Sequence, residues 1–251
     1  MSETIKKKKS RTQPTMQTVN VPPQLQALLE RLGRMGEEHG VAAYAVGGCV
    51  RDWLLGIARA TDLDVAIEGD GIAFAKQAAH ALGARVTPHE QFGTATLELS
   101  AERIDVASCR RETYAKPAAY PRVAPGTLRD DLFRRDFTIN AMAMVMAPRA
   151  FGKLVDPFGG LRDLKARRLR TLHPKSFLDD PSRILRAARF VQRYGLSLDA
   201  QTARALRQAI AAGMLARLNR GRLRKELDRM AEEPQPLACL ARLSQWLRPS
   251  R

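Results

Sequence analysis

VAAYAVGGCVRDWLLGIARATDLDVAIEGDG, residues 41–71, is the stretch that decides the fold. It opens with an apolar run, 41–46, which predicts a buried strand, and a pair of glycines ends that run. Residues 50–55 then predict a short helix, and residues 63–67 predict a second buried strand. Strands that alternate with a helix in this way predict a sheet flanked by helices.

Periodicity extends this pattern on both sides. Apolar residues at helical spacing predict helices over 24–38 and 71–82. Two strands are expected at 94–99 and 103–107, where they can form a hairpin, and Phe92 just before them is expected in the core. Residues 112–128 contain three prolines and a glycine, which predicts a long loop that is either functional or disordered.

The second half of the chain is expected to be mainly helical. Residues 140–146 are apolar and predict either a strand or a helix. No further strand is expected after residues 157–160. Helical patterns cover the rest, at residues 181–194, 200–212, 220–230 and 236–247. We therefore predict an α+β fold with three parts: a disordered basic tail (1–22), a head with a mixed sheet and helices (23–160), and an all-helical neck (161–251).

The charge of the chain points to a polyanionic partner. Among 251 residues, 42 are Lys or Arg and 26 are Asp or Glu, which gives a net charge of +16. Residues 161–251 carry 21 of the basic residues but only 8 of the acidic ones, and nearly all of these cations are Arg. Because Arg makes forked contacts with phosphate, we expect this part of the chain to hold nucleic acid.

Cysteine usage and hydropathy predict a cytoplasmic protein with no membrane segment. The three cysteines, Cys49, Cys109 and Cys239, have no metal-ligand or redox spacing, so we expect reduced thiols. No apolar run approaches the length of a membrane span, and the polar start of the chain, with four consecutive lysines at 6–9, is not a secretory signal. We expect a disordered tail there, with an auxiliary grip on RNA phosphates as the alternative.

Asp62 and Asp64 are the strongest chemical signal. Two residues apart on a strand, their side chains point to the same face, where carboxylate oxygens suit Mg²⁺ with substrate phosphates. The Gly47–Gly48 turn lies just upstream, where a backbone without side chains can approach phosphate closely, and Arg51 can fork onto a triphosphate. A lone D-x-D pair or a lone Gly-Gly turn would more often be surface or simple chain reversal, but here they fall within 18 residues.

These motifs resemble the first signature of class II tRNA nucleotidyltransferases and bacterial poly(A) polymerases, in the polymerase-β-like nucleotidyltransferase superfamily. Four later strings resemble the next family motifs in the same order: RRDFTINAMA (134–143), DPFGGLRDL (156–164), DDPSRILRAARFVQRYG (179–195) and GRLRKELDRM (221–230). The resemblance spans about residues 40 to 230. It implies a polymerase-β-like head followed by a helical neck.

The resemblance also implies roles for individual residues. Two Mg²⁺ ions would be held by Asp62 and Asp64, with Asp105 as a candidate third carboxylate or, alternatively, a structural Asp that faces solvent. Asp180 and Arg183 would select the incoming base, or else Asp180 would cap a helix and pair with Arg183. The remaining nucleotide-binding residues would be Gly47, Gly48, Arg51, Arg135, Asp136, Asn140, Arg186 and Arg189, of which Arg186 and Arg189 contact phosphates, stiffen the site, or simply pair with acidic neighbours.

The implied function is template-independent addition of nucleotides, A or C and A, to the 3′ end of tRNA from ATP and CTP. A poly(A) polymerase, a catalytically silent RNA-binding protein and a small-molecule nucleotidyltransferase are the alternatives. The long segment 112–130 and the FLDDPSR string (177–183) favour an A-adding or full CCA-adding enzyme over a CC-adding one, by resemblance. The chain stops about 20 residues after the fifth motif, so recognition centred on the acceptor stem is expected.

Overall fold

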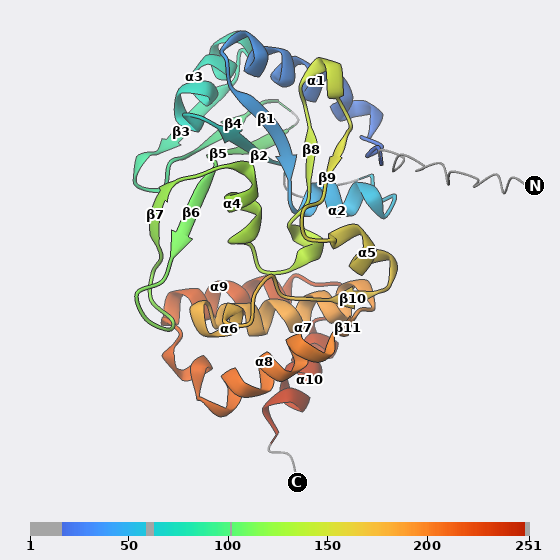
Figure 1. Ribbon diagram of the computed structural model, residues 1–251, viewed down its shortest axis with the longest axis vertical. Helices are drawn as coiled ribbons and strands as arrows, with labels where there is room; N and C mark the ends of the chain where they lie inside the picture. The colour runs from blue at the N-terminus through green and yellow to red at the C-terminus, as the bar shows by residue number, and fades with distance from the viewer. Residues whose placement is uncertain (1–16, 59–62, 101, 249–251) are drawn as a thin grey trace, which may run out of the picture.

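A seven-stranded mixed sheet forms the upper part of the molecule (Figure 1). The computed structural model describes residues 17–58, 63–100 and 102–248. The strands lie in the order β3-β4-β5-β2-β1-β8-β9, and only β2 and β5 are parallel neighbours. Their bounds are β1 Ala42–Val46, β2 Leu63–Glu68, β3 Arg85–His89, β4 Thr94–Glu98, β5 Arg103–Ser108, β8 Ala143–Val145 and β9 Leu154–Val155.

Helices surround the sheet and make up the lower part of the molecule (Figure 1). With the sheet are α1 Pro23–Glu38, α2 Gly48–Leu54, α3 Gly71–Leu82, α4 Leu128–Phe133 and α5 Gly160–Lys165. Below it are α6 Ser176–Asp179, α7 Ser182–Tyr194, α8 Ala200–Ala211, α9 Arg220–Ala231 and α10 Pro236–Leu247. This mixed-sheet and helical arrangement confirms the predicted α+β class.

Local sequence signals explain the sharp ends of α3. Asp70 accepts hydrogen bonds from the backbone N–H groups of Ile72 and Ala73, both at 3.0 Å, and so caps the first turn. Gly83 follows the last turn in the left-handed region, at φ +63°, which a residue without Cβ adopts at little cost. These two signals fix where α3 begins and ends, directly after β2 and before β3.

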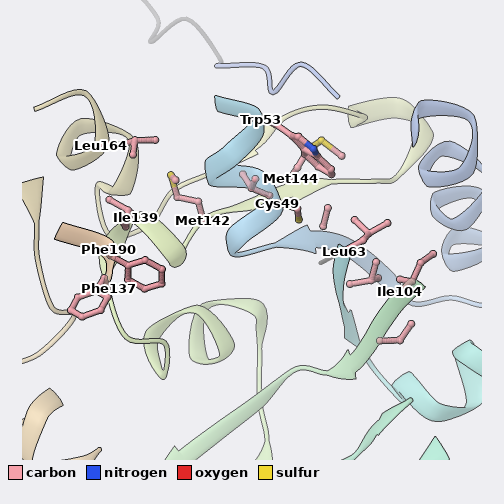
Figure 2. Packing of buried hydrophobic residues seen from close by; sticks show 14 of the residues in the cluster. Cys49, Trp53, Leu63, Ile104, Phe137, Ile139, Met142, Met144, Leu164 and Phe190 are labelled. Carbon is pink, nitrogen blue, oxygen red and sulfur yellow. The ribbon is translucent and has the colours of Figure 1, made fainter. Parts of the chain in front are cut away.

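A single hydrophobic core links the sheet to the lower helices. Phe190 of α7 packs edge-on against Phe137 at a ring-centroid distance of 5.8 Å. Figure 2 shows these rings in the same packed layer as Ile139 and Met142, with Cys49 and Trp53 of α2 beyond them. The predicted head and neck therefore share buried surface rather than forming two separate cores.

The structure corrects several expectations. The segment predicted as a long loop contains a hairpin, β6 Arg110–Thr113 with β7 Arg122–Pro125, and the sequence after residue 160 adds a parallel pair, β10 Arg168–Leu169 with β11 Ser197–Leu198. Phe92 is 58% exposed rather than part of the core, because the turn after β3 carries it at the surface.

The predicted disordered tail is also shorter at its C-terminal end. Thr18 forms a β-bridge with Lys153, and Val19 is buried in the core, so residues 17–22 lie against the sheet region. Residues 1–16, which include the lysine cluster, lie outside the described residues.

Candidate active site

The turn between β1 and α2 leaves room for one arginine. Gly47 adopts φ +79° and ψ −124°, a region open to glycine and closed to most other residues. A Cβ on Gly47 would collide with Nη1 of Arg135, which therefore lies directly against the Gly47 backbone. Gly48 begins α2 beside the guanidinium of Arg51. The turn and these two cations form one face of the site.

Arg135 is held there by charge. Its Nη2 donates to Asp131 of α4 at 3.1 Å, while its Nε is buried with no hydrogen-bond partner among the described residues. Burial would lower the pKa of this guanidinium, but the carboxylates of Asp131 and Asp64 outweigh that effect and raise it. Arg135 thus keeps its charge beside the glycine turn and close to Asp64.

Asp64 and Asp105 lie side by side on parallel strands. They are register partners in the β2–β5 ladder, so their side chains share one face of the sheet. Asp105 accepts a hydrogen bond from Thr96 Oγ at 2.7 Å and pairs with Arg103 at 3.4 Å. The predicted partner Asp62 lies outside the described residues, and among those described no three His, Cys, Asp or Glu side chains group closely enough to hold a metal ion.

Cys49 lies behind this face and stays chemically inert. Burial raises the pKa of its thiol to about 12, and the nearby Asp64 carboxylate adds to that effect. The thiol therefore remains protonated at neutral pH, where it is neither a nucleophile nor a metal ligand. The sequence prediction of reduced thiols agrees with the structure, since Cys49, Cys109 and Cys239 are all free and buried.

Arg51 is fixed inside a polar cluster. Its side chain donates to Asp52 at 2.9 and 3.0 Å and to Oδ1 of Asn140, and its guanidinium lies 4.5 Å from the Tyr194 ring centroid. It is 5% exposed. Because these contacts occupy the guanidinium, Arg51 acts here as a rigid support, and its predicted contact with a triphosphate remains a prediction.

Asn140 connects Arg51 to Asp136. Its Nδ2 donates to Asp136 Oδ1 at 2.9 Å, and Arg186 Nε donates to Asp136 Oδ2 at 2.7 Å. Burial would raise the pKa of this carboxyl, but Arg186 and the hydrogen bond from Asn140 hold it below its usual value. Asp136 is therefore ionised and held at the centre of the cluster, and its predicted role in nucleotide binding remains a prediction.

Asp180 and Arg183 have different partners. Asp180 Oδ1 accepts from the backbone N–H of Ser182 at 3.0 Å and pairs with Arg222 of α9 at 2.5 Å. Arg183 is buried and donates to Ser176 Oγ at 2.6 Å and to the Arg134 carbonyl at 2.7 Å. Asp180 thus precedes the N-cap residue Pro181 and binds the first N–H of α7, close to the structural alternative, whereas the Arg183 guanidinium has other partners.

Arg186 and Arg189, which we call the arginine ridge of α7, face α9. Arg189 donates to Glu226 at 3.1 Å and to Glu233 at 3.0 Å, and Arg186 lies 3.6 Å from Glu226. Glu226 and Glu233 are both buried. Arg189 therefore pairs with acidic neighbours, as the structural alternative predicted, while Arg186 reaches from this ion cluster to Asp136.

Sequence reasoning missed three residues that hold the site together. Asp131 anchors Arg134 and Arg135, Glu226 anchors the α7 ridge, and Arg222 pairs with Asp180. Asp131 stands three and four residues before Arg134 and Arg135, the spacing of ion pairs on a helix, and Glu226 lies in the basic string RLRKELDR. These were the available signals, because a buried cation needs a counter-charge.

The sequence model described as the poly(A) polymerase head domain matches residues 43–170. The chain belongs to the poly(A) polymerase head domain family. Its match includes both Asp64 and Asp105, the Gly47–Gly48 turn and the Arg135–Asn140 segment. The resemblance inferred from the motifs is therefore confirmed.

Relatives of known activity in this family are longer than this chain. An A-adding tRNA nucleotidyltransferase of Geobacter sulfurreducens is 43% identical over 90% of this chain but only 26% of its own length. A second, from Aquifex aeolicus, is 48% identical over 79% of this chain and 24% of its own length. The chain thus spans about a quarter of these two relatives.

Solved structures in the family have the same fold. The apo form II structure of a CCA-adding enzyme superposes with a TM-score of 0.85 at 42% identity, covering 92% of this chain and 57% of that one. The structure of the Thermotoga maritima CCA-adding enzyme complexed with tRNA superposes with a TM-score of 0.78 at 41% identity, covering 92% of this chain and 55% of that one.

Across residues 17–58, 63–100 and 102–248, no helix has both the length and the apolar character to cross a membrane.

Proposed function

We propose that this chain is a template-independent RNA nucleotidyltransferase that adds nucleotides to the 3′ end of tRNA. In the proposed reaction the terminal RNA hydroxyl attacks the α-phosphate of a nucleoside triphosphate, a new phosphodiester bond forms and pyrophosphate leaves. The observation that carries the proposal is the juxtaposition of Asp64 and Asp105 on one sheet face, with the cationic Arg135 fixed between that face and the Gly47 turn.

The carboxylate face suits Mg²⁺. Asp64 and Asp105 offer hard oxygen donors from adjacent strands, and Asp62 two residues before Asp64 would add a third. When bound, two Mg²⁺ ions supply activation of the attacking hydroxyl and neutralisation of the leaving pyrophosphate. Thr96 orients Asp105 through its 2.7 Å hydrogen bond, which keeps that carboxylate aimed along the sheet face.

The chain's own side chains would bind and orient the nucleotide. Gly47, Gly48 and Arg135 would receive the triphosphate, since a bare backbone and a fixed cation meet there. The rigid cluster of Arg51, Asn140, Asp136 and Arg186 would hold that wall in place. Asp180 and Arg183 would select the base, because a carboxylate accepts from the exocyclic amine shared by ATP and CTP, whereas UTP and GTP present a carbonyl.

The lower helices would hold the RNA. Their cations, such as Arg224 and Arg229, project from α9 with side chains 86% and 41% exposed. We assign residues 23–160 to a catalytic head and 161–251 to an RNA-binding neck on this basis. The relatives named for A addition favour adenosine as the added nucleotide, and a cytoplasmic location fits an enzyme of tRNA maturation with free thiols.

The deciding experiment uses three tRNA substrates, lacking the CCA end, ending in CC, or ending in CCA, each with ATP and CTP separately. An A-adding enzyme extends only the CC-ended tRNA, and only with ATP. Asp64→Asn and Asp105→Asn should each abolish transfer, whereas Glu98→Gln, a carboxylate exposed on the neighbouring strand, should not. Normal transfer by Asp64→Asn would refute the proposal.

Poly(A) polymerase activity is the second candidate, because the matching family description names it. The same assay separates the two. A poly(A) polymerase adds long runs of A to any RNA 3′ end, including a CCA-ended tRNA, whereas a tRNA enzyme stops after one completed end.

A further inference from the structure

An aromatic cluster lies at the surface where α4 ends. Phe133, the last residue of α4, is 46% exposed. Its ring centroid is 5.6 Å from that of Phe158 and 5.5 Å from that of His173. Arg129, one turn earlier on α4, lies 5.0 Å from the Phe158 ring centroid. We call Phe133, Phe158, His173 and Arg129 the aromatic ledge.

The ledge adjoins the residues proposed to select the base. The residue after Phe133 is Arg134, whose carbonyl accepts the hydrogen bond from Arg183. On the other side, His173 Nδ1 is 3.8 Å from Asp179 Oδ2, and Asp179 precedes Asp180 in the chain. The ledge is thus linked to both residues proposed to select the base through chain neighbours, Arg134 on one side and Asp179 on the other.

The chemistry of the ledge suits a nucleobase better than an apolar protein surface. Its exposed ring, Phe133, and the half-buried rings of Phe158 and His173 are accompanied by the cations Arg129 and Lys175, both exposed, which favours an anionic partner. Burial and the charge of Arg183 lower the pKa of His173, so its imidazole is an uncharged, flat ring at neutral pH. Rings interleaved with cations are how proteins stack unpaired bases while neutralising their phosphates.

We propose that the aromatic ledge stacks an unpaired base of the RNA 3′ end, with Phe133 as the main stacking ring and Arg129 on the adjoining phosphate. This inference rests on the proposed function in one respect only, that the acceptor is RNA. Phe133 is a positioning residue: it holds the strand that enters the site and touches neither the triphosphate nor the reacting atoms.

The test compares two RNAs with the same short stem, one with an unpaired single-stranded 3′ tail and one blunt. The full chain is titrated with each, and 2-aminopurine in the tail reports stacking through quenching of its fluorescence. Wild type should bind the tailed RNA more tightly and quench the probe. Phe133→Ala should weaken tailed binding about five- to hundredfold, the range for loss of one base-stacking ring, and leave blunt binding unchanged.

Two further variants make the test specific. Phe133→Leu keeps apolar surface but removes the π-face, so it should behave like Phe133→Ala, whereas Phe133→Tyr keeps the ring and should bind like wild type. Phe92→Ala removes another exposed phenylalanine, 58% exposed and outside the ledge, and is expected to leave binding unchanged. Thermal melting checks that each variant is folded, which the exposure of Phe133 favours.

The outcomes separate this inference from the proposed function. If Phe133→Ala keeps the wild-type ratio of tailed to blunt affinity, or if Phe133→Leu keeps it, the ledge does not stack a base and the inference is overturned. If the ratio collapses as expected but wild type transfers no nucleotide, the ledge stands and the proposed function fails. In an active enzyme, Phe133→Ala should raise KM for the tailed RNA while kcat at saturating RNA stays within about twofold.

Discussion

At the scale of single residues, the site depends on Gly47 because this residue has no Cβ. Gly47 lets the guanidinium of Arg135 lie where any other residue would place its Cβ. The phosphate-binding role proposed for the turn therefore rests on one backbone conformation and one cation, rather than on a hydrogen-bonding side chain.

Gly47→Ala should abolish nucleotide transfer while the protein still folds. The added Cβ is strained at φ +79° and displaces Arg135, with an expected loss of about 1–3 kcal/mol in the free energy of unfolding. Gly56→Ala is the matched control, since Gly56 also has positive φ, +75°, but a Cβ there meets nothing within 4 Å. The control should lose stability yet keep activity, and equal loss of activity in both variants would show that strain alone is responsible.

Asp136 should make the fold sensitive to acid. Its pKa in the folded protein is lowered, so its ionised form contributes stability above the unfolded value of about 3.9, and this contribution is lost as pH falls through the folded value. Asp136→Asn should be less stable than wild type at neutral pH and lose less on acidification from pH 5 to pH 2. Urea denaturation midpoints of both proteins across that pH range would measure the difference. Parallel curves of midpoint against pH for the two proteins would contradict the prediction.

At the scale of elements, α7 is held by charge as well as by its apolar face. Arg189 reaches both Glu226 and Glu233 on the neighbouring segment, and Arg186 bridges from Glu226 to Asp136. Since Asp180 and Arg183 stand at the start of α7, the same ion cluster sets the position of the base-selecting pair.

Glu226→Gln should destabilise the protein by about 3 kcal/mol, because the buried Arg189 loses one of its two carboxylate partners and Arg186 keeps only Asp136. Asp228→Asn, on the same helix, is the control: its side chain is 66% exposed and its pairing with Arg224 is long, at 3.9 Å, so a change within about 0.5 kcal/mol is expected. Thermal melts of the two variants decide the matter, and equal losses would mean that burial of the pair is unimportant.

The elements that sequence reasoning found are those with signals inside a few residues. The helix over 71–82 and the strand at 63–67 were predicted from apolar patterns within a few residues, and the structure adds the cap at Asp70 and the left-handed Gly83 that end this helix. The hairpin β6–β7 was not predicted, since the prolines in this segment indicate a loop. Its two strands also lack an apolar pattern, because they pair with each other at the surface instead of filling the core. The short helix α4 was missed although its capping box, Thr127 with Asp130, is readable in the sequence.

The candidate site was predicted as a set of residues but not as an arrangement. Asp105 was left between a metal-site and a surface role because the register of β2 against β5 joins strands that are not consecutive in the chain. The partners of Asp180 and Arg183 could not be found from their spacing, since Arg222 and the Arg134 carbonyl come from distant segments. Long-range pairing of this kind leaves no periodicity to detect.

At the scale of the whole molecule, charge is divided between the two parts. Residues 1–160 carry a net charge of only +3, from 21 basic and 18 acidic residues, and residues 161–251 carry +13. The field proposed to attract RNA therefore comes mainly from the lower helices, while the carboxylates of the sheet remain available for Mg²⁺ in the proposed mechanism.

RNA binding should weaken steeply with salt, at a slope of log K against log salt of about −0.7 for each phosphate neutralised on single-stranded RNA. Arg224→Gln, which removes a cation 86% exposed on α9, should reduce the slope by about 0.7. Arg103→Gln, with a side chain 68% exposed on β5, should not change it. Filter-binding titrations at several salt concentrations supply the slopes, and an equal reduction in both variants would place the RNA elsewhere.

The pairing of β1 with β8 also governs how the protein is made. Val46 pairs with Ala143, which is about 100 residues later in the chain. During synthesis β1 therefore leaves the ribosome long before β8, the strand that pairs with its edge. The entropy of closing so long a loop grows only slowly with length, about 0.6 kcal/mol per doubling, so the delay affects folding rate more than final stability. During that interval the nascent chain carries an apolar, unpaired strand edge, which makes the first half of this protein a client for chaperones and a poor candidate for expression alone.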